Sequence, residues 1–239
     1  MSVQTSTVTA NKPNWFIRTI NSSIGRKIIM GLTGLFLILF LIVHLAGNLQ
    51  LLFGDQGESF NKYAYFMGHN EVIQIVSILN FGFIFLHILF SMFLAANNAK
   101  ARPVKYAYEK RSAKGSWSSR NMLLLGTIVL IFLVVHLQGL WWKSKFGPIP
   151  TVSYDGTEYH DLYAVTKAAF SQLWLVILYV ISMAALAFHL VHGFQSAFQT
   201  MGMRHRKYTP LIKTVGVIFS ILVPVGFAAI PVIMYLQSL

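Results

Sequence analysis

Five long runs of apolar residues, separated by short polar segments, dominate the chain. Each run holds roughly 20 residues or more, the length that a helix needs to cross about 30 Å of hydrocarbon. The first run is too long for a signal peptide, follows a 27-residue arm and lacks an Ala-x-Ala cleavage motif, so we expect it to remain in the mature protein. The predicted spans are residues 28–52, 72–97, 121–142, 171–198 and 214–236.

The connections between these runs are short and show no internal repeat. The pattern therefore predicts an all-α membrane protein, with five transmembrane helices in one bundle over residues 28–239 and an amino-terminal arm over residues 1–27. Residues 55–67 place Phe60, Tyr63 and Met67 at helical spacing, which predicts a short helix lying on the membrane surface. Segment 146–161 carries Pro, Gly and Asp-Gly turn signals and is expected to fold back over the outer mouth of the bundle.

The basic residues alternate between the two sides of the predicted spans. Segments 1–27, 98–120 and 199–213 carry more Lys and Arg than Asp and Glu. Segments 53–71 and 143–170 carry no such excess. By the positive-inside rule, this alternation predicts a cytoplasmic amino terminus and a carboxyl terminus outside. We expect a multi-pass protein of a bacterial-type inner (cytoplasmic) membrane, with the lipid bilayer as its solvent.

Composition narrows the chemistry. The chain has 239 residues, of which 55% are hydrophobic and only 11% charged, against about 25% charged in soluble domains. Its net charge of +12 lies in the connections between apolar runs rather than on one polar face, which argues against nucleic acid as a partner. The absence of cysteine excludes disulfides, iron–sulfur ligation, thiolate-bound haem and c-type haem attachment.

Histidine is the ionisable residue that the spans do contain. Ionisable side chains at membrane depth are costly, so their default interpretation is functional. The alternative for a single histidine is a hydrogen bond to a neighbouring helix. Five of the eight histidines lie in four different spans: His44, His87, His136, His189 and His192.

Depth sorts these histidines into two levels. Spans one and three start inside, so His44 and His136, which lie 16 and 15 residues along them, fall in the outer half of the membrane. Spans two and four start outside, so His87 and His189 fall in the inner half. Each level therefore has one histidine from each of two helices, and about 10 Å of height separates the levels.

Paired histidines on two helices, in an apolar bundle without cysteine, favour bis-histidine iron in haem b. Zinc is a weaker candidate because structural sites use four ligands and catalytic sites three, whereas each level offers two. A proton relay normally includes Asp or Glu, which the spans lack. Three glycines favour a flat cofactor close to the backbone, or alternatively close helix packing: Gly34, Gly126 and Gly193.

His192 leaves the inner level ambiguous. It follows His189 by three residues, so both side chains lie on nearly the same helix face. Periodicity alone does not choose between them.

The sequence resembles a known family, the five-helix dihaem cytochrome b anchor subunit of succinate dehydrogenases and fumarate reductases. The resemblance covers residues 20–236 and rests on histidines in the first four spans and none in the fifth. The matching stretches are SSIGRK, GLTGLFLILFLIVHLAGNLQ, ESFNKYAYFM, FLHILFSMFLA, IVLIFLVVHL and FHLVHGFQSAFQTMGM. In the family, glycines follow the fourth-span ligand at offsets that Gly193 and Gly202 match from His189, so the resemblance favours His189 over His192.

This resemblance implies two haem b groups, an outer one on His44 and His136 and an inner one on His87 and His189. It implies that flavoprotein and iron–sulfur subunits on the cytoplasmic face carry out the dicarboxylate chemistry. The chain would then be the quinone-reactive membrane subunit of an oxidoreductase, passing electrons through the haems to or from a quinone, with menaquinone the expected type.

Two further groups of residues are candidates on the same basis. Near the outer haem, Glu71 is the first candidate for the quinone site, with His69, Glu58 and Trp141 as neighbours, because quinone oxygens need hydrogen bonds and proton exchange. Near the inner level, the candidates to pair with haem propionates are Arg26, Lys27, Lys100, Arg204 and Arg206. The alternative for these basic residues is ordinary positive-inside topology.

Two other functions remain open. One is the dihaem cytochrome b of another membrane oxidoreductase, such as a formate dehydrogenase or hydrogenase. The other is a haem-free membrane anchor or transporter that uses its histidines for helix contacts or as a proton relay.

Overall fold

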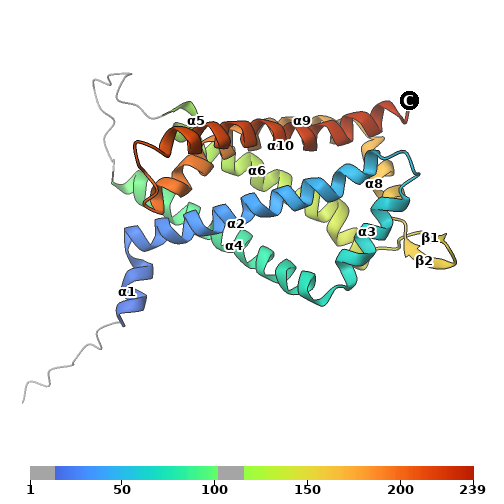
Figure 1. The fold of residues 1–239 in the computed structure, drawn as a ribbon, viewed down its shortest axis with the longest axis horizontal. Coiled ribbons are helices and arrows are strands. Elements are labelled where there is room, and N and C mark those ends of the chain that lie inside the picture. Colours follow the sequence, from blue (N-terminus) through green and yellow to red (C-terminus); the bar gives the residue numbers. More distant parts are fainter. Residues whose placement is uncertain (1–13, 102–115) are drawn as a thin grey trace, which may run out of the picture.

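The computed structural model describes residues 14–101 and 116–239 and is dominated by five long helices that run alternately in opposite directions (Figure 1). The long helices are α2 (Ser23–Leu49), α4 (Glu71–Lys100), α6 (Met122–His136), α9 (Leu173–Thr200) and α10 (Thr209–Leu236). The helical stretches that include them are long and apolar enough to cross a membrane: Ser23–Leu52, Glu71–Lys100, Met122–Phe146, Leu173–Thr200 and Thr209–Leu236. The prediction of five apolar spans is thus confirmed in number and place.

The first span begins earlier than hydropathy predicts. Ser22 accepts a hydrogen bond from the backbone N–H of Gly25 at 2.9 Å, which caps the first turn, so α2 starts at Ser23 rather than at Ile28. The part of the predicted arm that the structure describes includes a short helix, α1 (Trp15–Asn21). Residues 1–13 of that arm, and residues 102–115 of the basic segment 98–120, lie outside the described residues.

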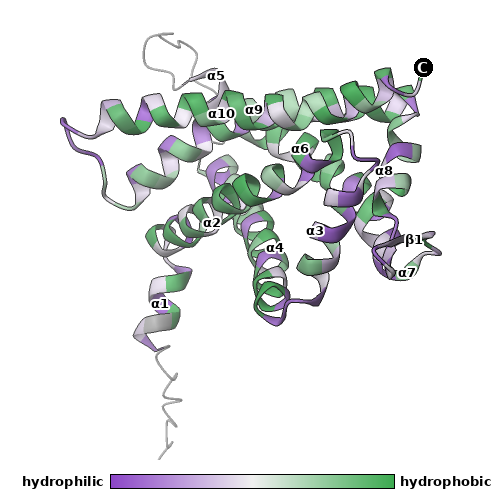
Figure 2. Ribbon diagram, turned by 45° about the vertical axis from the view of Figure 1, so that its right-hand side comes forward, coloured by the Kyte–Doolittle hydropathy of each residue, from purple (hydrophilic) through white to green (hydrophobic). Residues whose placement is uncertain are grey.

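Apolar side chains cover the outside of the long helices. Leu39, Ile78 and Leu222 are all more than 60% exposed, and Figure 2 shows predominantly hydrophobic helices with polar residues gathered at their connections. A surface of this kind is not stable against water but matches the hydrocarbon of a bilayer.

Four of the long helices form the walls of the interior. The backbone of α2 packs against α4 and α9, and that of α6 packs against α9, whereas α2 and α6, and likewise α4 and α9, make few or no close backbone contacts. Helix α10 packs along α9 and also touches α2. Inward-pointing side chains of α2 and α6, and likewise of α4 and α9, can therefore meet across the bundle.

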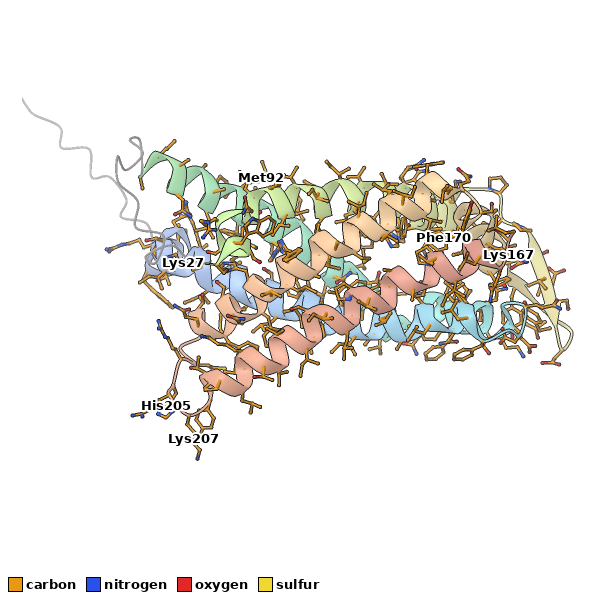
Figure 3. The ribbon with its side chains drawn as sticks, turned by 90° about the horizontal axis from the view of Figure 1, so that it is seen from above. Lys27, Met92, Lys167, Phe170, His205 and Lys207 are labelled. Carbon is orange, nitrogen blue, oxygen red and sulfur yellow. The ribbon has the colours of Figure 1, made fainter. Side chains whose placement is uncertain are left out.

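The two ends of the bundle differ in chemistry. Lys27, His205 and Lys207 lie at one end, where α2 and α10 begin, and we call it the basic end (Figure 3). Lys167 and Phe170 lie at the other, near the β-hairpin described next, and we call it the hairpin end. The short elements η1 (Gln50–Leu52), α3 (Glu58–His69) and α8 (Leu162–Phe170) gather at the hairpin end, whereas α5 (Trp117–Arg120) precedes α6.

Segment 146–161 folds into a hairpin rather than a plain loop. Strands β1 (Thr151–Tyr154) and β2 (Thr157–His160) pair antiparallel, following the short helix α7 (Lys143–Phe146). Asp155 and Gly156 form the turn with positive φ angles of 51° and 79°, as a type I′ hairpin turn requires. Hydropathy did not predict these strands because each has only four residues.

Asn61 ties the hairpin end together. Only 1% exposed, it donates from Nδ2 to the Tyr154 hydroxyl at 3.2 Å and to Asp161 Oδ1 at 3.0 Å, while its Oδ1 accepts from the Tyr163 backbone N–H at 3.0 Å. Gly57 has a φ of 90° and lies against the ring of Tyr163, so a side chain at this position would overlap that ring. Helix α3, predicted over residues 55–67 and observed over Glu58–His69, is thereby fastened to β1 and α8.

Replacing Asn61 with alanine is expected to loosen this end. The change removes three hydrogen bonds to the half-buried residues Tyr154, Asp161 and Tyr163, which costs about 2 kcal/mol in free energy of unfolding. Thermal unfolding in detergent and proteolysis at the Asp155-Gly156 turn measure the effect. Asn97→Ala, at an exposed site on α4, is the matched control. Equal protease resistance of the two variants would contradict the role of Asn61.

Candidate functional site: two histidine pairs across the bundle

Four histidines meet in two pairs inside the bundle. The rings of His44 on α2 and His136 on α6 have centroids 5.9 Å apart and planes at 87°. The rings of His87 on α4 and His189 on α9 have centroids 6.4 Å apart and planes at 62°. Each pair joins two helices whose backbones do not pack together, so the rings extend toward each other through the interior.

The spacing of both pairs fits a metal ion held between two imidazoles. An imidazole nitrogen binds a first-row metal at about 2.0 Å and its ring centre lies roughly 1.1 Å further, so two imidazoles on opposite sides of one ion have centres about 6.2 Å apart. The observed 5.9 and 6.4 Å lie on either side of this value. Among the described residues there is no cluster of three or more His, Cys, Asp or Glu that could hold a metal ion. The arrangement therefore suits a cofactor whose iron needs two protein ligands.

Aromatic rings surround the pair nearer the hairpin end. Phe40 stacks on His44 with centroids 5.0 Å apart, and Phe132 stacks on His136 with centroids 5.5 Å apart. In both cases the phenylalanine precedes the histidine by four residues, one helical turn. Phe227 of α10 lies 5.6 Å from His44. These rings provide an apolar surrounding for a flat cofactor.

Hydrogen bonds orient two of the histidines through their Nδ1 atoms. Thr33 Oγ1 lies 3.2 Å from His87 Nδ1, and the Thr33 hydroxyl also donates to the Ile29 carbonyl at 2.9 Å. With its hydroxyl proton directed to that carbonyl, Thr33 can accept from Nδ1–H, and in that tautomer His87 Nε2 keeps a lone pair able to bind a metal. The Tyr179 hydroxyl, on α9, lies 3.1 Å from His136 Nδ1.

Sequence reasoning missed these partners. Tyr179 precedes His189 by ten residues on α9, about 15 Å along the helix. This offset alone would have placed Tyr179 near the level of His44 and His136. Asn48 was also missed: its Nδ2 donates to the His44 carbonyl at 2.7 Å and lies 3.3 Å from His44 Nδ1.

Glycines flank the pair nearer the basic end. A Cβ added at Gly34 of α2 would lie 3.4 Å from His87 Cε1, and one at Gly126 of α6 would lie 3.8 Å from His189 Cε1. Each ring is thus bordered by the bare backbone of a helix outside the pair. A Cβ at Gly193 would meet nothing within 4 Å, so this glycine does not share that role.

Two buried polar side chains, Asn80 and Ser182, lie at the level of the His44–His136 pair. Asn80 and Ser182 each precede an inner-level histidine by seven residues, about 10 Å along the helix, so they lie on the same face as His87 and His189. Within the described part of the chain, Asn80 Oδ1, Ser182 Oγ and His189 Nδ1 are buried without a hydrogen-bond partner. Buried polar atoms are nearly always satisfied, so this interior is suited to a group or a water that completes them.

Comparisons with protein-family models, with curated proteins and with solved structures find no match for this chain. The capacity of the site is therefore inferred from its own geometry. Two pairs of imidazoles in one apolar bundle can hold two planar iron cofactors at different depths, one above the other.

His192 takes no part in the facing pairs. It lies on α9 one turn beyond His189 and makes no ring contact with residues 14–101 or 116–239, whereas the ring of His189 faces that of His87. The geometry therefore favours His189 as the partner of His87, and iron ligation by either histidine stays a prediction.

The four quinone candidates lie at the hairpin end but in different surroundings. Glu58 pairs with Lys62 at 2.6 Å, and a second partner of Lys62, Asp155, lies at 2.9 Å. The Lys62 ammonium donates hydrogen bonds to both carboxylates, which raises its pKa. Glu58 is thus engaged in a surface ion pair, while Glu71 is exposed at the first turn of α4.

The other two candidates are engaged with aromatic rings. His69 stacks on Tyr65 with centroids 3.9 Å apart, and its Nδ1 lies 2.8 Å from the Tyr65 carbonyl. Trp141 lies 5.1 Å from Phe81 of α4. The contacts recorded for these four residues do not gather them around one cavity.

The basic candidates lie at the basic end. Arg26 is half-buried, with its guanidinium 5.6 Å from the ring centroid of Phe93 on α4. The other four candidates are exposed: Lys27, Lys100, Arg204 and Arg206. Arg26 is therefore the least exposed of the five basic candidates.

Proposed function

We propose that this chain is the membrane cytochrome b subunit of a succinate:quinone oxidoreductase, that is, of a succinate dehydrogenase or fumarate reductase. It binds two haem b groups, one on His44 and His136 and the other on His87 and His189. It anchors flavoprotein and iron–sulfur subunits, which carry out the dicarboxylate chemistry, and it exchanges electrons with a quinone, with menaquinone the expected type.

The observation that carries this proposal is the pair of ring separations, 5.9 and 6.4 Å, across two pairs of helices that do not pack together. A histidine that merely bonds a neighbouring helix needs no second histidine facing it. A proton relay would place its groups in a hydrogen-bonded chain, often with a carboxylate. Facing imidazoles at this separation are what bis-histidine iron requires.

The residues around the pairs have distinct roles in this proposal. Haem supplies one-electron transfer when bound. Thr33 and Tyr179 orient His87 and His136 through Nδ1, and the glycines Gly34 and Gly126 keep the space beside the inner pair free of side chains. The bilayer and the aromatic rings exclude water from both levels.

The orientation follows from the basic residues. The basic end faces the cytoplasm, with the amino terminus, and the hairpin end faces outside, with the carboxyl terminus, in a bacterial-type inner membrane. The partner subunits dock on the basic end. Arg26 is the leading candidate for a haem propionate partner, followed by Lys27, Lys100 and Arg204.

A reduced-minus-oxidised absorption spectrum of the purified chain, with haem quantitation, tests the proposal. Two b-type haems per chain are expected, and a preparation from its native membrane without haem would end it. Co-purification of a flavoprotein and an iron–sulfur subunit is expected as well. Their replacement by other redox subunits would assign the chain to a different membrane oxidoreductase.

Replacing Thr33 with valine is expected to weaken the inner haem. Valine keeps the shape of threonine but cannot accept from His87 Nδ1–H, and loss of such an orienting bond typically lowers affinity for the metal about 10- to 100-fold. Transfer of haem from the purified chain to an excess of an apo-haem acceptor measures the loss. Thr33→Ser, which retains the hydroxyl, is the control. Identical transfer from the valine and serine variants would refute this role.

A further inference from the structure

A cavity of about 460 Å³ opens at the hairpin end. It lies between α8, the start of α9 and η3 (Leu137–Trp142), a π-helical turn that continues α6. π-Helical turns interrupt the regular register and are frequent at functional sites. None of the four quinone candidates named from the sequence lines this cavity.

Its walls combine apolar surface with hydrogen-bond donors. Val135, Val165 and Leu175 provide apolar contacts, and Trp174 provides a flat ring. The polar side chains in the lining are Gln138, Lys143 and Gln172, and the lining contains no carboxylate. The size matches cavities that bind small molecules, which range over about 300–1,000 Å³.

The donors in this cavity are available. Trp174 Nε1 donates to Gln172 Oε1 at 2.9 Å, which directs the carboxamide of Gln172 and leaves its NH₂ group to donate elsewhere. Within the described residues, no side-chain hydrogen bond or ion pair engages Gln138 or Lys143. A ligand with acceptor oxygens and a flat apolar ring complements this set of groups.

Two residues of the lining lie close in sequence to the residues of the histidine pair. Val135 adjoins His136 in the chain, and Leu175 precedes Tyr179 by one helical turn on α9. Tyr179 lies 3.1 Å from His136 Nδ1. A ring bound in the cavity would therefore lie about one turn of α9 beyond the residues that contact His136.

We propose that this cavity binds the ring of a quinone, whose two carbonyl oxygens accept hydrogen bonds from Gln138, Gln172 and Lys143. The inference rests on the proposed function, which makes a quinone the substrate. A lipid phosphate is the competing ligand with acceptor oxygens, but it would leave the flat wall of Trp174 unused and would find a single cation in the lining. The proposal thus places the ring against α8 and α9 rather than against α3.

Photolabelling with an azido-naphthoquinone, on the full chain in phosphatidylcholine nanodiscs, locates the ring. Label is expected in residues 165–175 and should be displaced by excess unlabelled naphthoquinone. Label confined to residues 58–71, or label that unlabelled quinone does not displace, would overturn the proposal. Displacement by added anionic phospholipid in place of naphthoquinone would mark a lipid site instead and would also overturn it.

A second measurement uses the glycine in the cavity wall. A Cβ at Gly139 meets nothing within 4 Å, so leucine there projects into open space and narrows the cavity. Gly139→Leu is expected to weaken naphthoquinone binding, read from tryptophan fluorescence, at least about tenfold, equivalent to 1.4 kcal/mol. Gly82→Leu is the matched control, since Gly82 lies on α4 and is also free of neighbours within 4 Å.

The outcomes separate this proposal from the proposed function. Unchanged quinone affinity in a folded Gly139→Leu variant would reject the cavity, whether or not the chain holds haem. Should that variant not fold, Gln172→Leu at an exposed position takes its place, with an expected loss of about threefold to tenfold for one hydrogen bond. Displaceable label in residues 165–175 on a chain without haem would support the cavity and reject only the cytochrome.

Discussion

Replacing His44 or His136 with alanine is expected to lower the haem content from two groups per chain to one. Each variant leaves iron at this level with one protein ligand, and the removed ring also leaves a space among Phe40, Phe132 and Phe227. The His87–His189 pair is untouched, so its low-spin bis-histidine spectrum should persist. Haem quantitation and electron paramagnetic resonance on the purified variants measure both quantities.

The control for this experiment is His205→Ala, an exposed histidine at the basic end, which should retain both haems (Figure 3). The double variant His44→Ala/His136→Ala should lose no more haem than either single variant, because both changes remove the same site. Loss of a second haem in the double variant would show that the two histidines do not share one iron.

The second large effect concerns the pair nearer the basic end. His87→Ala and His189→Ala are each expected to remove the other haem and to retain the one on His44 and His136. His192→Ala should retain both haems, since the His192 ring does not face His87 whereas the His189 ring does. The same spectra and haem quantitation distinguish the three variants.

A single outcome would reverse this assignment. If His192→Ala loses one haem and His189→Ala keeps two, the ligand lies one turn further along α9 and the geometry described above is not that of the haem-bound chain. Loss of both haems in His87→Ala, with normal protein yield, would indicate instead that the two levels assemble together.

The five long helices could be predicted because hydrocarbon imposes a minimum length of apolar residues, and this constraint is visible in sequence. Their ends were harder to predict. Helix α2 begins at Ser23 because the Ser22 side chain caps it, and α4 extends to Lys100, since polar residues continue a helix beyond the hydrocarbon. The hairpin over Thr151–His160 escaped prediction because its packing depends on Asn61, which is about ninety residues away in sequence.

Depth predicted which helices share a histidine level, and the choice of His189 over His192 came from the family resemblance. A fixed rise per residue puts histidines from oppositely directed helices at common levels, and the rings of the same two pairs face each other in the structure. The depth of a residue does not show in which direction its side chain points around the helix axis. The contacts of Thr33 with His87 and of Tyr179 with His136, and the cavity beside η3, depend on how the helices are rotated and packed.

Helix α4 is attached to the bundle along one side. Its backbone packs against α2 and against α3, while its His87 ring faces His189 of α9 and its Phe81 ring contacts Trp141. The His87–His189 level is therefore bounded between α4 and α9 by side chains, whereas both helices that carry His44 and His136 pack their backbones against α9.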